Sequence, residues 1–186
     1  MGASIIAHGS SHRGSTSSAV EWGHTTVIAG GRTCRCGARG CLEAYAGAEA
    51  ILDRYGGPPP GTDEESALAA LIGLAATSDG AASERAAEVL DEAALYLGVS
   101  VGNLINLFTP ERIIIGGWAG LLLGERMLPA IEAAAREHSL RYPFAQTSIE
   151  LGRLGPDAVA LGAATLPIEA LLAGTVLTAK SDRSAS

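Results

Sequence analysis

The segment "EWGHTTVIAGGRTCRCGARGCLEAYAG", residues 21–47, holds the densest group of reactive side chains in the chain. It contains all three cysteines and one of the four histidines, with Glu21 at its start and Glu43 near its end. An odd number of cysteines does not form the disulfide framework of a secreted domain. The segment therefore indicates another use for its thiols.

The spacing of four side chains in this segment predicts a structural zinc site. The pattern H-x9-C-x-C-x4-C supplies one imidazole and three thiols, a standard tetrahedral ligand set for zinc. The predicted ligands are His24, Cys34, Cys36 and Cys41. Gly37 and Gly40 would let the backbone turn tightly around the metal. The alternatives are a disulfide or three free buried thiols, but adjacent C-x-C pairs bridge poorly and free cysteines rarely cluster in a reducing compartment. Four protein ligands leave no position for water, so the predicted metal is structural and not hydrolytic.

Length and charge restrict the class of protein. The 186 residues fit one ordinary domain or one lobe of a larger protein. The net charge of -7 repels phosphate backbones, so we expect no direct nucleic-acid binding by this chain. No apolar run is long enough to span a bilayer and no signal peptide opens the chain. These features predict a cytoplasmic protein without a membrane partner.

The hydrophobic pattern predicts an α/β lobe with a partly parallel sheet. The predicted strands are residues 3–7, 24–29, 113–115 and 146–155, and residues 10–18 read as an irregular polar connection. The predicted helices are residues 42–55, 62–76, 83–107, 124–140 and 157–173. Either Thr62 or Asp63 is expected to cap the second of these helices.

Several motifs together resemble the ROK family of bacterial sugar kinases and sugar-responsive repressors. They are E-x-G-H at residues 21–24, C-x-C-G-x-x-G-C-x-E at residues 34–43, "NLINLFTPERIIIGG" at 103–117 and "GPDAVALGAA" at 155–164. The resemblance runs from Gly2 to Ala173 and implies an actin-like, ribonuclease H-like ATPase fold. It implies that residues 1–174 form the C-terminal lobe, with an inserted zinc loop at 24–41, and that residues 175–186 form a disordered tail.

The same resemblance implies that the N-terminal lobe is absent. The D-x-G-G-T phosphate loop and the N-D motif that carries the catalytic Asp in the family do not occur in this sequence. We therefore expect no kinase activity from this chain alone, and a role for ATP and Mg²⁺ only where a first lobe is present. Two residues depart from the family pattern. Ser4 replaces Gly or Ala, and Val20 replaces a small residue and is expected to crowd the sugar loop.

The resemblance implies a sugar site formed by Glu21, His24 and Glu43. Carboxylates accept hydrogen bonds from sugar hydroxyls, and His24 would bind zinc through one ring nitrogen and face a sugar hydroxyl with the other. The alternative for each glutamate is an ordinary exposed carboxylate or, for Glu43, a helix N-terminal one.

In the family's kinases the turn at Gly116 and Gly117 lies beside the adenine. The alternative is a plain strand-to-helix turn, which two glycines also suit. Trp118 follows this turn and would narrow a nucleotide site. We therefore favour a plain turn, and with it a regulator over a kinase.

Three functions are left open by the sequence. The first is the sugar-binding, dimerising effector lobe of a transcriptional regulator, the second is a truncated ATP-dependent sugar kinase of glucokinase type, and the third is an inactive truncated product. In the family, strand 3–7 pairs with a strand that this sequence lacks, so it would leave an unpaired edge. That edge, together with the dimer contacts that the family makes through this lobe, predicts a homodimer or larger assembly. Sugar binding is expected to be weak, because only half of the cleft is present.

Overall fold

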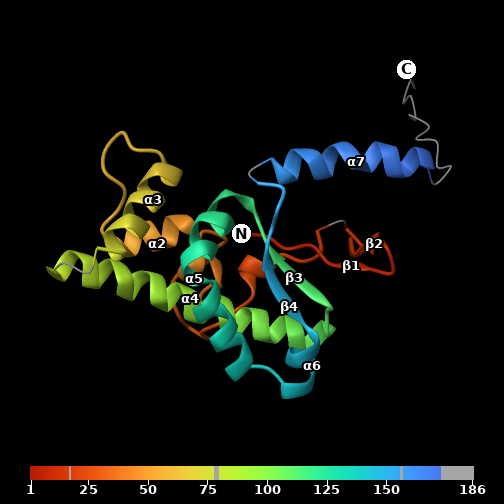
Figure 1. Cartoon of the computed structure of the whole chain (residues 1–186), viewed down its shortest axis with the longest axis horizontal. Coiled ribbons are helices and arrows are strands. Elements are labelled where there is room, and N and C mark those ends of the chain that lie inside the picture. Colours follow the sequence, from red (N-terminus) through yellow and green to blue (C-terminus); the bar gives the residue numbers. More distant parts are fainter. Residues whose placement is uncertain (17, 78–79, 156, 173–186) are drawn as a thin grey trace.

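The computed structural model describes residues 1–16, 18–77, 80–155 and 157–172 (Figure 1). The strands are β1 (Ile6–Ala7), β2 (Ser10–Ser11), β3 (Arg112–Ile115) and β4 (Ser148–Leu151). The helices are the 3-10 helix η1 (Trp22–His24), α1 (Glu43–Ala46), α2 (Ala48–Tyr55), α3 (Glu64–Ala75), α4 (Gly80–Phe108), α5 (Gly117–Glu137), α6 (Arg141–Gln146) and α7 (Ala158–Leu172). The predicted tail at 175–186 lies outside the described residues, as does the end of the predicted lobe.

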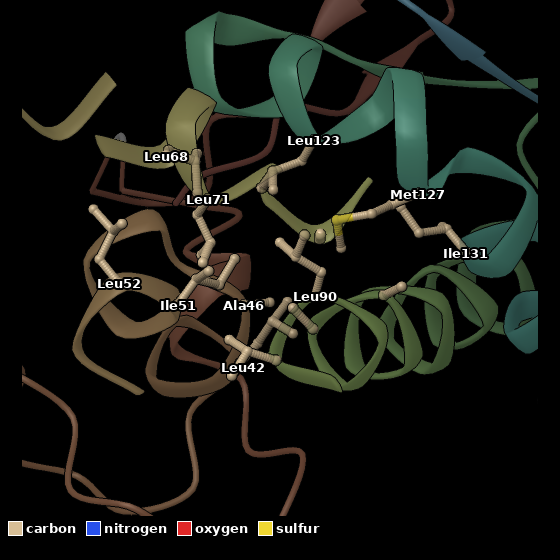
Figure 2. Packing of buried hydrophobic residues seen from close by; sticks show 14 of the residues in the cluster. Leu42, Ala46, Ile51, Leu52, Leu68, Leu71, Leu90, Leu123, Met127 and Ile131 are labelled. Carbon is tan, nitrogen blue, oxygen red and sulfur yellow. The ribbon is translucent and has the colours of Figure 1, made fainter. Parts of the chain in front are cut away.

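Two long helices, α4 and α5, form the centre of the hydrophobic core (Figures 1 and 2). Helices α1, α2 and α3 all pack on α4 and bury apolar side chains in the same core. The largest fully buried side chains include Leu42, Ile51, Leu68, Leu90, Ile105 and Ile131. The segment that follows the last cysteine is thus anchored in the core through Leu42.

Strands β3 and β4 form a parallel pair, as expected for an α/β lobe. Ile113 lies opposite Ile149 and Ile115 lies opposite Leu151. Helix α5 connects the two strands and packs against both of them. The α/β fold class predicted from the sequence is confirmed. The turn at residues 116–117 follows the carboxyl end of β3.

Several predicted element boundaries were wrong. Helix 42–55 is interrupted at Gly47, whose extended backbone separates α1 from α2. Helix α5 begins at Gly117, directly after β3, and not at residue 124. The short helix α6 was not predicted at all. Asp63 is the cap of α3, because its carboxylate accepts a 2.9 Å hydrogen bond from the Ser66 N–H.

The predicted strand 24–29 is also wrong. Its first residue ends η1, and Thr26 makes only an isolated bridge with Cys41. Backbone bonds from Val27 to the Gly40 carbonyl and from Leu42 to the Thr25 carbonyl close a loop here instead of extending a sheet. Thr25, Thr26 and Val27 thus pair with residues 40–42 where the cysteine loop begins and ends.

The N-terminal strand differs from its prediction in length and in pairing. It is reduced to β1, which pairs with β2 in an antiparallel hairpin. His8 and Gly9 connect the two strands with φ of 52° and 76°, the left-handed backbone of a two-residue hairpin turn. The expected strand 3–7 is therefore too long, and part of the expected irregular connection at 10–18 forms β2 instead. Within this two-stranded sheet β1 has one partner, so its other edge is unpaired among the described residues.

None of the helices in the described part of the chain is both long enough and apolar enough to cross a membrane.

Candidate metal centre and adjoining cavity

The cysteine loop is folded by backbone hydrogen bonds around its two turns. The Cys34 N–H donates to the Ala38 carbonyl at 2.8 Å, and the Gly37 N–H donates to the Cys34 carbonyl at 2.9 Å. Gly40 has a φ of 84°, and a Cβ at this position would overlap the Ile28 carbonyl oxygen. The sequence prediction that these glycines allow tight turns is confirmed, since Gly37 also has a positive φ of 89°.

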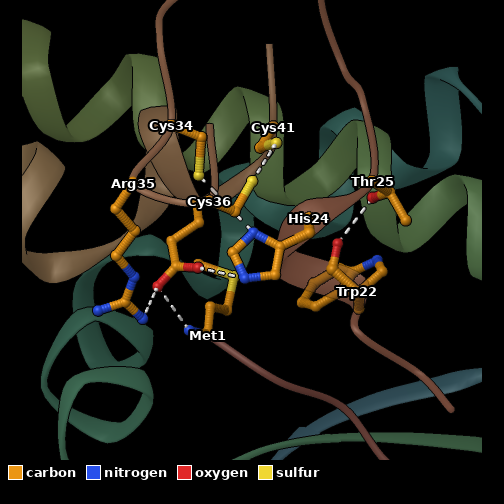
Figure 3. A network of polar contacts seen from close by, with 9 residues as sticks. Met1, Trp22, His24, Thr25, Cys34, Arg35, Cys36 and Cys41 are labelled. Atoms are coloured by element: carbon orange, nitrogen blue, oxygen red, sulfur yellow. Dashed lines mark hydrogen bonds and ion pairs between the residues drawn. The ribbon is translucent and has the colours of Figure 1, made fainter. Parts of the chain in front are cut away.

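The loop brings four possible metal donors together (Figure 3). The donor atoms of His24, Cys34, Cys36 and Cys41 all lie within 4.8 Å of one another. The Cys36 and Cys41 sulfurs are 3.7 Å apart, and the Cys34 sulfur is 3.6 Å from His24 Nδ1. A tetrahedral zinc with ordinary Zn–S and Zn–N bonds separates its ligands by roughly 3.6–3.8 Å. The donor set therefore fits zinc in chemistry and in spacing, and all three cysteines are free of disulfides.

Burial and hydrogen bonding act differently on the thiols. Burial, followed by contacts with the other two cysteines, raises the pKa of Cys41 to about 12. The backbone hydrogen bond from Ala38 lowers the pKa of the exposed Cys36. A metal that binds here would displace the Cys41 proton, because the thiolate is the ligand form.

Glu43, at the start of α1, lies close to the nitrogen atoms of three other residues. Its Oε1 accepts from Arg35 at 2.6 Å and from the Met1 ammonium at 2.9 Å. Its Oε2 lies 3.4 Å from His24 Nε2, the ring nitrogen that faces away from the cysteines. Burial alone would raise the pKa of Glu43, but the ammonium, Arg35 and His24 outweigh it and lower the pKa. Glu43 is thus an ionised carboxylate beside the donor cluster.

A cavity of about 1350 Å³ opens beside this cluster. Its wall includes Trp22, Arg35 and Glu43 on one side and the Gly116–Gly117 turn with Trp118 on another. Two segments far apart in the sequence therefore face one space. The volume exceeds the few hundred Å³ of a typical small-ligand pocket, so the cavity is an open groove.

Not every predicted site residue lines this cavity. Glu21 is exposed, stands just before η1 and is not among the cavity-lining residues. His24 also lies outside the lining and reaches it only through Glu43. Trp22 and Arg35 line the cavity but were not predicted as site residues, although both lie inside the two motifs.

The glycine turn at the far wall connects β3 to α5. Gly117 has a φ of 76°, so a side chain here would be strained, whereas Gly116 is extended. Trp118 is half-buried and packs against the hydrophobic core. The two glycines thus form a strand-to-helix turn, and binding of a nucleotide beside it stays untested.

Comparison with known proteins finds one family and relatives that belong to it. The ROK family profile matches residues 1–170. The xylose repressor of Caldicellulosiruptor bescii is 31% identical over 184 residues, which cover 92% of this chain and 44% of the repressor. The glucokinase of Halalkalibacterium halodurans is 34% identical over 171 residues, which cover 87% of this chain and 51% of the glucokinase.

A solved structure agrees with these matches. A ROK family transcriptional regulator, described as a homolog of the E. coli MLC protein, has a TM-score of 0.77 and 31% identity, and the match covers 94% of this chain and 44% of that chain. The chain thus spans about half the length of the curated relatives it matches. Family profile, sequence and structure agree over nearly all of its residues, and the chain belongs to the ROK family.

Proposed function

We propose that this chain is the sugar-binding effector lobe of a ROK transcriptional regulator, stabilised by a structural zinc ion. The lobe comprises residues 1–174, and the zinc loop comprises residues 24–41. One observation carries the proposal. The Glu43 carboxylate is held ionised on the wall of a 1350 Å³ cavity, directly beside four zinc-compatible donors.

The proposed zinc is bound by His24 and the three cysteines, and it gives the loop the folding free energy that a closed structural site supplies. With Nδ1 directed to the metal, Nε2 of His24 carries the ring proton and points toward Glu43. Such a carboxylate–histidine contact fixes the orientation of the imidazole and of the carboxylate. Glu43 is then positioned to accept hydrogen bonds from a sugar hydroxyl, with Glu21 as a second, exposed carboxylate.

One observation favours a regulator over a kinase. The half-buried Trp118 directly follows the glycine turn and lines the cavity there, and its bulky ring narrows the space beside a turn that borders the adenine in kinases of this family. The sugar kinase remains the second candidate, because the glucokinase of H. halodurans matches at 34% identity. In that case Gly116 and Gly117 would border the nucleotide.

Calorimetry tests the sugar site. Titration of the zinc-loaded chain with xylose, glucose and N-acetylglucosamine is expected to show binding of at least one of them. Glu43→Gln is expected to weaken that binding by about tenfold or more, since hydrogen bonds to a charged group contribute roughly 1.5–3 kcal/mol. Glu49→Gln is the matched control, because Glu49 lines the same cavity without contacting the donor cluster. Equal affinities of the two variants would contradict the assignment of Glu43.

A coupled kinase assay separates the two candidate functions. We expect the chain with ATP, Mg²⁺ and the sugar that binds to give no turnover above the blank. Turnover that Glu43→Gln abolishes would favour the kinase.

A further inference from the structure

Arg32 stands at the entrance of the cysteine loop, and both of its backbone polar groups are bound. Its N–H donates to the Tyr45 hydroxyl at 2.9 Å. Its carbonyl accepts from the Gly40 N–H at 2.8 Å. Because Cys34 and Cys41 follow these two bonded residues closely, the position of Arg32 sets the spacing of two of the four donors.

The Arg32 side chain reaches from the loop to the long helix α4. Its guanidinium lies 4.6 Å from the centroid of the Tyr45 ring, and its NH2 is 3.4 Å from Glu92 Oε1 on α4. The Tyr45 ring in turn lies 4.6 Å from the ring of Tyr96, one turn further along α4. Arg32 therefore contacts α4 directly through Glu92 and indirectly through the tilted pair of Tyr45 and Tyr96 rings.

Glu92 is a rigid partner for this contact. Its Oε2 is paired with Arg54 NH2, and the Arg54 side chain is only 13% exposed. Arg54 also donates to the Tyr45 carbonyl at 2.8 Å and to the Val89 carbonyl at 3.2 Å. These bonds hold Glu92 in place whether or not Arg32 is paired, so the loop docks on a preformed acceptor.

We propose that Arg32 is a positioning residue of the metal loop and that its pairing with Glu92 holds the loop in its metal-binding conformation. This inference rests on the proposed metal site and adds to it a support from outside the loop. Helix α4 lies at the centre of the hydrophobic core and is ordered by that packing, so it offers the loop a fixed surface. The expected effect of the contact is slower release of a metal bound in the loop.

The chain contains a matched pair of variants that test this positioning role. Arg32→Gln removes the contact with α4 and leaves the part-buried Arg54–Glu92 pair intact. Arg39→Gln removes the same charge from the same loop, but among the residues that the structure describes the Arg39 side chain bonds only to the Gly30 carbonyl and the Thr33 hydroxyl, both within the loop. Zinc release into a chromophoric chelator and hydrogen exchange of the loop and α4 amides are measured for the full chain and both variants, with and without zinc.

We expect Arg32→Gln to release zinc about tenfold faster than the wild type, the lower end of the range for contacts that support metal ligands, and Arg39→Gln to stay within about twofold. In the zinc-free chain the Cys34 and Gly40 amides should exchange faster in Arg32→Gln than in the wild type and in Arg39→Gln, whereas exchange of the α4 amides should change little. One bound zinc with equal release rates in both variants would overturn the positioning role alone. A wild-type chain that binds no zinc would overturn the proposed metal site together with it.

Discussion

Val20 occupies a backbone conformation that suits its side chain poorly. Its φ is 68°, in the left-handed region, where a residue with a Cβ costs roughly 1–2 kcal/mol and a β-branched residue is an outlier. Asparagine tolerates this region better. We predict that Val20→Asn raises the free energy of unfolding by about 1 kcal/mol, measured by urea denaturation.

Val27 is the control for this prediction. It is also half-buried, packs against the core and has no positive φ. The same substitution there relieves no strain and places an amide against apolar side chains, so Val27→Asn should destabilise the chain. Destabilisation of similar size at both positions would show that strain at Val20 is unimportant. Val20, which replaces a small residue of the family pattern, thus has a strained backbone conformation. That its side chain crowds the sugar loop stays a prediction.

At the scale of elements, the packing of α4 on α5 depends on the small size of Gly98. A Cβ on Gly98 would lie 2.6 Å from the Ile131 carbonyl oxygen and would also overlap the Ala134 side chain. Backbone on a packed helix cannot move away without separating the two helices. We predict that Gly98→Ala destabilises the chain by about 1–3 kcal/mol in thermal or urea unfolding, because it overpacks the core.

Gly73 provides the opposite case on α3. It is also helical, but a Cβ there would meet nothing within 4 Å. Gly73→Ala is therefore expected to stabilise the chain by about 0.5–1 kcal/mol through helix propensity alone. If both substitutions shifted stability in the same direction, close contact between α4 and α5 would not be the cause.

At the scale of the whole molecule, α7 extends away from the core (Figure 1). It exposes apolar side chains to solvent. The exposed residues include Val159, Leu161, Leu166, Ile168 and Leu171. Apolar surface of this kind promotes association. The homodimer predicted from the sequence remains a prediction, and α7 is a better candidate surface for it than β1, which the hairpin already pairs on one side.

Light scattering at micromolar concentration checks this prediction. The wild type is expected to be a dimer or larger, and Leu161→Asp should reduce its mass toward that of the monomer, because a charge would be buried in the contact. Ser4→Asp is a control at an exposed position outside α7. A wild type that is monomeric at these concentrations would rule out the assembly.

The sequence by itself determined those features that are local along the chain. The four donors lie between residues 24 and 41, so a short loop with two turn glycines is enough to bring them close to one another. The span of α4 followed from helical periodicity, which needs no distant partner. The family motifs are likewise contiguous, and the profile match over residues 1–170 agrees with them.

Only the tertiary structure decided the features that depend on distant contacts. The segment 24–29 has strand-like residues but no neighbouring strand, so it closes a loop. The environment of Glu43 arises because η1 and the N-terminus fold onto α1. The contact between Arg32 and Glu92 joins residues 60 positions apart. Periodicity and motifs report the preference of a residue for its own local backbone, whereas these contacts exist because packing of α1, α2 and α4 brings separate surfaces together.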